Sequence, residues 1–174
     1  SKLISLLKTL SKNEIRWFKD YIYSPYFNKE KVLMKLADHM AEYHPEYDDK
    51  GLDKEKVFAF LYPGKKYNDA MMRNMISDLL KLANGFLLTL SLKRNEFRKD
   101  MLLLEELKIR KLTAHFIKHK ERITDTLEES PYKDEHYYDK QYELNLLYSS
   151  FQKDITDSYI RENQLYQDIS DLLT

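Results

Sequence analysis

Cysteine is absent from this sequence of 174 residues, and glycine and proline are scarce, with three and four residues. Without cysteine the chain can form no disulfide, no thiolate metal site and no thiol nucleophile. The few glycines and prolines leave little material for the tight turns that join β-strands, and 33% of the residues are charged, which is typical of long surface helices. We therefore expect an all-α protein, a bundle or array of about eight helices.

Long hydrophobic runs are also missing. Runs such as Phe86–Leu88 and Met101–Leu104 are short, whereas a membrane-spanning helix needs roughly 18 or more mostly apolar residues. We therefore expect a soluble chain with no membrane association. The sequence shows no secretory signal, and the lack of cysteine suits a reducing compartment, so the cytoplasm is the expected location. Because the chain begins at Ser1 and ends at Thr174 without a cap or a polar tail, we also expect a fragment of a longer protein.

The net charge is zero, from 29 basic and 29 acidic residues. No overall excess of charge therefore favours nucleic acid or an anionic membrane as a partner. The distribution along the chain is uneven: residues 93–122 carry 10 basic and 5 acidic groups (+5), whereas residues 123–174 carry 4 and 12 (−8). The chain thus has a basic middle and an acidic end.

Polar capping residues mark the helices of the first half of the chain. Ser11 and Glu14 have the spacing of a capping box, in which each side chain satisfies an unpaired backbone N–H at the start of a helix. Asn28, Asp53 and Asn68 are placed to cap three further helices. Apolar residues recur at intervals of three and four behind each of these positions, as a helix with one buried face requires.

From Leu92 onward the helical patterns become longer and contain fewer glycine and proline breaks. We therefore predict an N-terminal helical domain over residues 1–91 and a C-terminal array of helix hairpins over residues 92–174, with one continuous domain as the alternative. A tight joint between two helices is expected at Leu112-Thr113, with the threonine as cap. The last pattern begins with Tyr138, Tyr142 and Leu146 and leaves open whether it is one helix or two. It continues at helical spacing through Tyr148, Phe151, Ile155, Tyr159, Glu162, Tyr166, Ile169 and Leu173.

A short sequence pattern, here called the internal echo, occurs twice in the second half of the chain. The pattern Leu112-x-x-x-Phe116-x-Lys118 recurs as Leu147-x-x-x-Phe151-x-Lys153, an offset of 35 residues (147 − 112). This offset is close to the period of helix-hairpin repeats such as the tetratricopeptide repeat, although the tryptophan and Leu-Gly signature of that repeat is missing. A stacked repeat array and a plain helical bundle therefore both remain open.

Three sequence markers lie within the first 90 residues. They are Leu10-Ser11-Lys12-x-Glu14, Ser24-Pro25-Tyr26-Phe27-Asn28-Lys29 and Phe58-x-x-Leu61-Tyr62-Pro63-Gly64-x-x-Tyr67. Together they resemble a family of uncharacterised helical proteins from Bacteroidetes-type bacteria, over roughly residues 10 to 90. The resemblance implies a bacterial cytoplasmic protein and attaches no activity to it.

No motif for catalysis, for a cofactor or for a metal is found in the sequence. His115 and His119 share a helix face, but two ligands do not make a metal site, and the neighbouring Lys118, Lys120 and Arg122 repel a cation. Three isolated glycines cannot supply the Gly-x-Ser-x-Gly turn of a serine hydrolase. We therefore expect no catalytic residue, no cofactor and no metal. An enzyme that uses carboxylates within a helical bundle is a third alternative to the two functions considered next.

The 14 tyrosines are the most unusual feature of the composition. Most are expected to be core or boundary residues, because tyrosine buries a large ring while its hydroxyl reaches a polar partner. Tyrosine is also enriched at protein interfaces, and the acidic last third contains more tyrosines than one helix face can bury. Our leading hypothesis is therefore a non-catalytic interaction or scaffold module with one acidic, tyrosine-rich face toward a protein partner, formed by Tyr132, Tyr137, Tyr138, Tyr142, Asp154 and Asp157.

The alternative hypothesis is a regulator that binds nucleic acid. The helical patterns over residues 54–90 resemble a helix-turn-helix unit, in which Lys65, Lys66 and Arg73 would contact phosphates. The connection is longer than the usual three or four residues, and apolar spacing predicts that the second helix is largely buried, so this function is not favoured.

Overall fold

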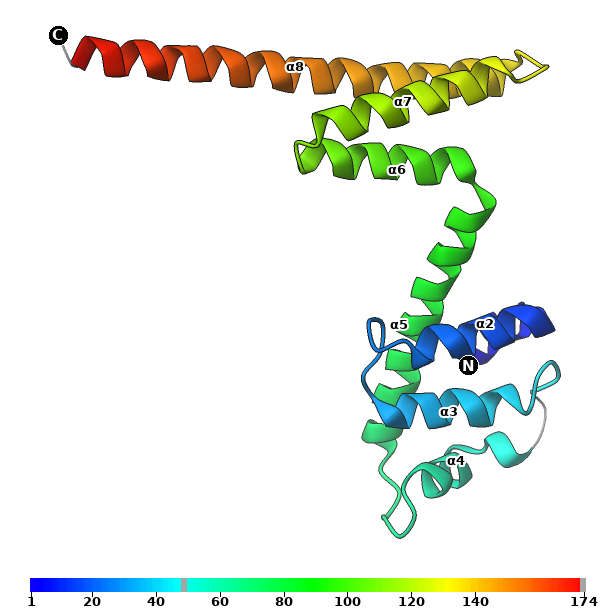
Figure 1. The fold of residues 1–174 in the computed structure, drawn as a ribbon. Helices are drawn as coiled ribbons and strands as arrows, with labels where there is room; N and C mark the ends of the chain where they lie inside the picture. Colours follow the sequence, from blue (N-terminus) through cyan, green and yellow to red (C-terminus); the bar gives the residue numbers. More distant parts are fainter. Residues whose placement is uncertain (48–49, 173–174) are drawn as a thin grey trace. The chain divides into compact units, whose positions relative to one another are not determined.

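The computed structural model describes residues 1–47 and 50–172, and their side chains up to Gln164 with the exception of Lys50. These residues form eight α-helices and one short 3-10 helix, with no β-strand in the described part of the chain (Figure 1). The predicted all-α fold class is confirmed. Contacts within the chain separate two compact units, Ser1–Ser91 and Leu92–Thr174, here called unit 1 and unit 2.

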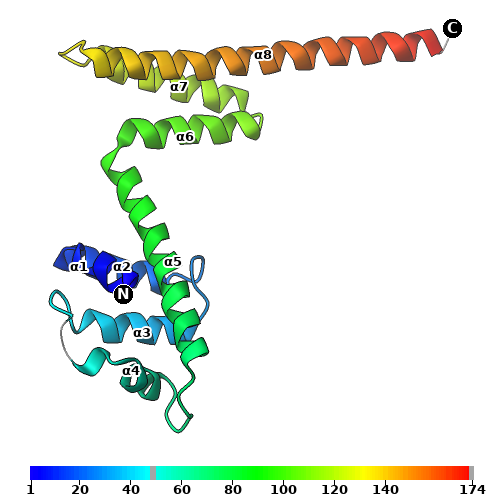
Figure 2. The same ribbon diagram turned by 180° about the vertical axis from the view of Figure 1, so that it is seen from behind.

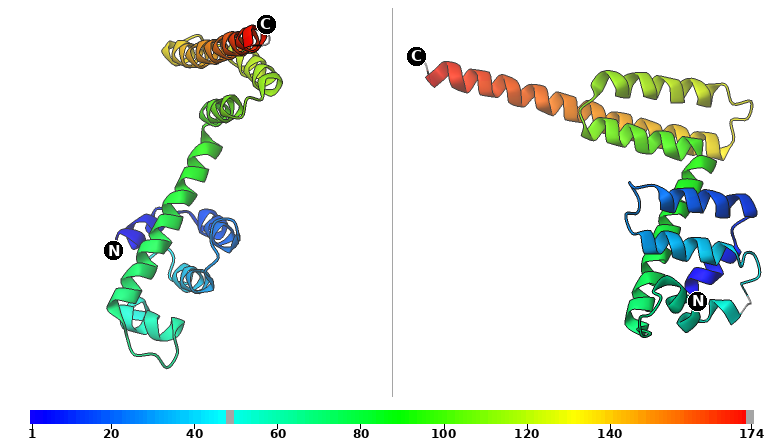
Figure 3. Two further views of the ribbon diagram at one scale, coloured as in Figure 1. Left: turned by 90° about the vertical axis from the view of Figure 1, so that its left-hand side faces the viewer. Right: turned by 60° about the horizontal axis from the view of Figure 1, so that its bottom comes forward.

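Unit 1 has a single hydrophobic core enclosed by five helices. In Figures 1 and 3 helices α2 and α3 lie side by side, and the long α5 runs across them. Apolar side chains at helical spacing on every one of these helices enter the core, as amphipathic helices require. The helices are α1 (Lys2–Lys8), α2 (Lys12–Tyr23), α3 (Lys31–Ala41), α4 (Lys54–Leu61) and α5 (Asp69–Arg94), with the 3-10 helix at Lys50–Leu52.

Three of the predicted helix caps in unit 1 are confirmed. The backbone N–H of Ser11 donates to the Glu14 carboxylate (2.8 Å), and the N–H of Glu14 donates to the Ser11 hydroxyl (3.2 Å), which completes the capping box. Asp53 accepts from the second backbone N–H of α4, and Asn68 accepts from the N–H of Met71 at the start of α5, both at 3.0 Å. Local sequence therefore determines where these helices begin.

The predicted cap at Asn28 is wrong. Helix α3 begins three residues later, with Glu30 at its N-cap position. The buried amide of Asn28 instead donates to the carbonyl of Ile22 (3.1 Å) and accepts from the N–H of Glu30 (3.0 Å). Because the last carbonyls of a helix lack partners within it, Asn28 satisfies the end of α2 and fixes the direction in which the chain enters α3.

Gly85 has a packing role within α5. A Cβ atom at this position would lie 2.6 Å from the hydroxyl oxygen of Tyr21. The Tyr21 ring stacks on Phe27 (centroids 4.0 Å apart) and meets Phe86 edge-on (5.8 Å). Glycine costs about 1 kcal/mol relative to alanine in a helix interior, and here it admits an aromatic cluster that joins α2 to α5.

Within the described residues α5 is the one helix that is long and apolar enough to cross a membrane; an 18-residue stretch has a mean hydropathy of 1.3. The core helix of a globular unit meets the same criterion, so length and composition do not establish a membrane location. The prediction that the chain is not associated with a membrane stays a prediction. Six residues of α5 are buried in the core of unit 1: Met72, Met75, Leu79, Ala83, Phe86 and Leu90.

Unit 2 is an antiparallel helix hairpin followed by one very long helix. Helices α6 (Glu96–Ile109) and α7 (Thr113–Glu128) form the hairpin, and α8 (Glu135–Leu172) returns along it (Figure 2). The last sequence pattern is therefore one helix of 38 residues, about 57 Å long at 1.5 Å per residue. The core of this unit is small: Met101, Leu104, Phe116, Ile123, Leu144 and Phe151.

The joint between α6 and α7 lies where it was predicted, but Thr113 does not cap it. Leu112 occupies the N-cap position without a side-chain hydrogen bond. The turn is closed by backbone bonds instead: the N–H of Leu112 donates to the carbonyl of Leu107 and that of Lys111 to Lys108, both at 3.0 Å. This is the Schellman arrangement, which requires a left-handed residue, and Lys111 adopts φ 57°.

Lys111→Gly should raise the free energy of unfolding by about 1 kcal/mol, because a residue with a Cβ is strained in the left-handed region. Lys118→Gly is the matched control, since Lys118 is an exposed lysine within α7 and its loss should lower stability by about 1 kcal/mol. Urea unfolding followed by circular dichroism measures both. Equal destabilisation by the two variants would contradict this account of the turn.

The internal echo of the sequence falls on two consecutive helices. Phe116 of α7 and Phe151 of α8 stack face to face, with centroids 3.8 Å apart and planes 11° from parallel. Equivalent residues of a helix-hairpin repeat lie two helices apart. In this unit the echo therefore corresponds to a pair of packing partners.

Candidate functional site

The four candidate tyrosines lie at the beginning of α8 and in the loop before it. Tyr137 is buried, with its ring edge-on to Tyr138 (5.1 Å) and Lys133 above it. Tyr132, Tyr138 and Tyr142 are exposed. Tyr137 is thus a packing residue. We call the three exposed tyrosines, which lie in the loop and the first turns of α8, the tyrosine end.

The two candidate aspartates are not part of the tyrosine end. Asp154 and Asp157 follow Tyr142 by 12 and 15 residues in α8, a separation of roughly 18 to 22 Å along the helix axis. Asp154 also forms an ion pair with Lys108 of α6 (3.1 Å). The structure therefore does not bring the six candidates together into one face.

A cleft of about 750 Å³ lies beside Tyr132 and Tyr137, and five of its lining residues are acidic. Much of this negative charge is neutralised within the chain. Arg98 pairs with Glu143 (2.7 Å), and a side-chain hydrogen bond from Lys99 lowers the pKa of Glu96. The tyrosine end is therefore less acidic than the sequence indicates.

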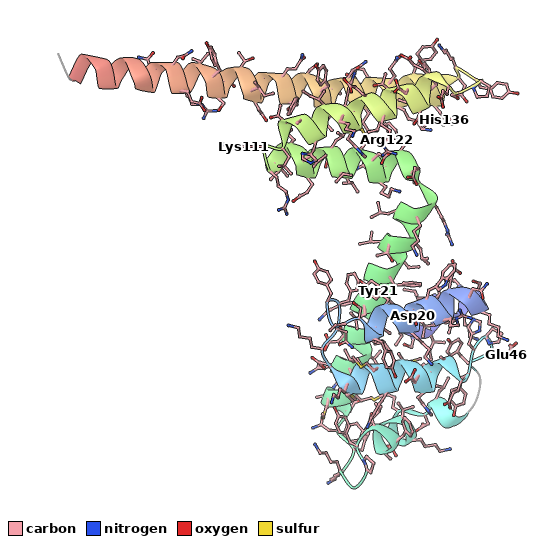
Figure 4. The ribbon with its side chains drawn as sticks, viewed as in Figure 1. Asp20, Tyr21, Glu46, Lys111, Arg122 and His136 are labelled. Carbon is pink, nitrogen blue, oxygen red and sulfur yellow. The ribbon has the colours of Figure 1, made fainter. Side chains whose placement is uncertain are left out.

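A second cleft, of about 770 Å³, lies where the hairpin ends and α8 continues. One wall is the end of α6 and the α6–α7 turn, and the other wall is α8. Figure 3 shows α8 extending well beyond the hairpin, and Figure 4 places Lys111 at the turn. We call this cleft the α8 groove; its apolar lining residues are Ile109, Leu147, Phe151, Ile155 and Tyr159.

The apolar stripe of α8 continues into this groove. Leu144 and Phe151 are seven residues apart and are buried against the hairpin. Ile155 and Tyr159 follow Phe151 by four and eight residues, which keeps all of them on one side of the helix. Ile155 is nevertheless 43% exposed, Tyr159 is 65% exposed, and Ile109 on the opposite wall is 73% exposed. Burial stops because the hairpin ends, whereas the apolar pattern of α8 does not.

Charged groups of both signs border the α8 groove. Lys108 donates a hydrogen bond to the Ser150 hydroxyl (2.6 Å) and pairs with Asp154, so it fixes the end of α6 to α8. The segment 108–120, which includes the turn, contains five lysines and arginines and no acidic residue. Glu105, Glu162, Lys111 and Arg161 also line the groove. An apolar floor with charged edges suits an amphipathic partner.

Of the paired histidines, His119 has a structural role. Its ring lies 3.3 Å from the buried carboxylate of Asp100, and Arg122 donates to the same carboxylate at 2.7 Å (Figure 4 labels Arg122). The three side chains join α6 to α7. Among the described residues no group of three side chains is arranged to hold a metal ion.

The basic residues proposed to bind nucleic acid lie on the α4–α5 turn and the first turns of α5. Lys65 sits over the ring of Tyr62 (5.0 Å), and Arg73 pairs with Asp69 (2.9 Å). Lys66 is exposed in the turn. Two of the three cations thus already have partners within unit 1, and the buried face of α5 points into the core.

No family model, no curated protein and no solved structure matches this chain. The surfaces of the described residues are therefore the basis for a functional proposal.

Sequence reasoning treated Ile155 and Tyr159 as inward residues and did not single out Ile109. The lengths of the helices could have indicated that part of α8 remains uncovered. Helices α6 and α7 have 14 and 16 residues, whereas α8 has 38, so more than half of α8 cannot be covered by the hairpin. The stripe positions Tyr166, Ile169 and Leu173 lie outside the described side chains.

Proposed function

We propose that this protein is a non-catalytic protein-interaction module that binds an amphipathic helix in the α8 groove. The observation that carries the proposal is the continuation of the α8 apolar stripe, through Ile155 and Tyr159, past the end of the hairpin that buries its first half. A partner helix laid there would occupy the position that α6 and α7 occupy beside Phe151. Helix-in-groove recognition works in this way, with apolar anchors every three or four residues.

The groove has the features of a protein-binding surface. Tyr159 and Ile155 supply large apolar area, and burying such area stabilises a complex by about 25 cal/mol per Å² before the costs of association. Phe151 stacks on Phe116 at the floor and holds the stripe in place. Lys108 and Asp154 pair with each other at the edge, so the closure of the groove over a partner need not leave either charge unpaired. We also propose that the protein is located in the cytoplasm.

Photo-cross-linking at single positions tests this function. A benzoylphenylalanine placed at Tyr159 is expected to give one dominant cross-linked polypeptide in intact cells, because a partner covers this ring. The matched control is the same group at Tyr142, another exposed tyrosine of α8, which should cross-link weakly. Equal cross-linking at the two positions, or none at Tyr159, would refute the assignment of the groove.

A further inference from the structure

We infer that the partner in the α8 groove is the α8 helix of a second copy of this chain, packed antiparallel. This inference rests on the proposed function of the groove. The part of α8 beyond Phe151 is both a wall of the groove and an amphipathic helix of the kind that the groove accepts. A twofold arrangement lets each copy place Ile155 and Tyr159 against the corresponding stripe of the other.

The length of the free part of α8 fits this arrangement. Residues 152–172 continue α8 beyond Phe151 as 21 helical residues, which is about 30 Å at 1.5 Å per residue. In an antiparallel pair each such segment lies along the other and runs toward the α6–α7 turn of the other copy. The two apolar stripes and the walls beside Ile109 would then be covered together.

Charge favours the antiparallel direction. Residues 108–120 around the turn carry five basic and no acidic residues. Two of the five, Lys108 and Arg110, pair with Asp154 and Glu106 of the same chain, and Lys111 and Lys118 are exposed. Residues 152–174 carry two basic and five acidic residues (−3). Antiparallel packing sets the acidic segment of one copy beside the basic turn of the other, whereas parallel packing sets acidic segment beside acidic segment.

Two further features support a second copy as the occupant. Lys111 lies at the turn (Figure 4). It forms no ion pair with the described residues of its own chain, unlike Lys108 and Arg110 beside it, so it is available to an acidic partner. The chain also has zero net charge, so two copies do not repel each other as whole molecules.

Sedimentation velocity of the purified 174-residue chain over a range of concentrations tests the inference. The expected species at high concentration has twice the chain mass of 21.0 kDa (2 × 21.0 = 42.0 kDa). Ile155→Glu with Tyr159→Glu should weaken dimerisation by roughly 100-fold, because two central contacts are lost. The control Tyr138→Glu with Tyr142→Glu, also in exposed positions of α8, should leave the dimer intact.

A charge reversal tests the direction without touching the apolar stripe. Lys111→Glu should weaken the dimer by about 10-fold, and added salt should weaken the unmodified dimer. Circular dichroism of each variant checks that it is folded. A 21.0 kDa species at every concentration would overturn the inference, as would a dimer that both glutamate pairs leave unchanged. Cross-linking at Tyr159 to a different polypeptide would overturn the second copy while the groove function stands.

Discussion

Phe151→Ala is expected to lower the free energy of unfolding by about 3–5 kcal/mol, the range for removing a buried aromatic ring. Phe151 is 4% exposed and stacks on Phe116 with ring centroids 3.8 Å apart. Its ring joins α8 to α7, and the buried core of unit 2 contains few other side chains. The alanine variant therefore removes a large part of the contact that keeps α8 on the hairpin. Urea unfolding followed by circular dichroism measures the change.

Leu146→Ala is the control for Phe151→Ala. Leu146 lies five residues earlier on the same helix and is 53% exposed, so its truncation should change stability by about 0.5 kcal/mol or less. Similar losses for the two variants would show that burial at Phe151 does not determine the stability of this unit.

Phe58→Ala should destabilise unit 1 to a similar extent, by about 3–5 kcal/mol. Phe58 is 1% exposed, and its ring contacts Tyr62 and Tyr67 at centroid distances of 5.2 and 5.5 Å. The short helix α4 supplies few other core residues, so the loss of this ring removes the main contact of the helix with the core. The unfolding transition in urea should shift to lower concentration.

Helix α4 also provides a closely matched control. Phe60 is two residues away on the opposite face, 54% exposed, and stacks on His39 with centroids 4.6 Å apart. Phe60→Ala should cost only about 1 kcal/mol, the worth of an aromatic pair at a partly exposed position. If Phe60→Ala were the more damaging of the two, the assignment of the inner face of α4 would be wrong.

The parts of the fold that depend on local sequence could be predicted. The capping box of Ser11 and Glu14 and the caps at Asp53 and Asn68 form as expected, because each requires only residues within the same turn. The proposed caps at Asn28 and Thr113 were wrong. In both places the deciding hydrogen bonds involve the end of the preceding helix: the Ile22 carbonyl in one case and the Leu107 carbonyl in the other.

The α8 groove could not be predicted from periodicity alone. Helical spacing places Phe151, Ile155 and Tyr159 on one side, and the sequence therefore indicates the same burial for all three. Their different exposure depends on where the α6–α7 hairpin ends, which is fixed by the turn at Lys111 and by the stacking of Phe116 on Phe151. The residues of the predicted acidic tyrosine face are also not gathered together. Most of them lie along one long helix, α8, whose two parts have different neighbours.

Mutations in the tyrosine end and in the α8 groove should have different effects on partner binding. Tyr138 and Tyr142 belong to the tyrosine end, whereas Ile155 and Tyr159 belong to the groove, although all four are exposed residues of one helix. Substitutions in the first pair should leave partner binding unchanged, and substitutions in the second pair should weaken it strongly. Combined replacement of residues from both surfaces would conceal this difference.

Hydrogen exchange of α8 tests the central claim most directly. In a dilute solution of the purified chain, the amides of residues 152–164 should exchange far faster than those of residues 137–151, because a helix segment with few packing partners is only marginally stable in water. Protection of residues 152–164 should then rise when the groove is filled. Equal protection of the two segments in dilute solution would contradict the account, because it would mean that the exposed part of α8 needs no partner.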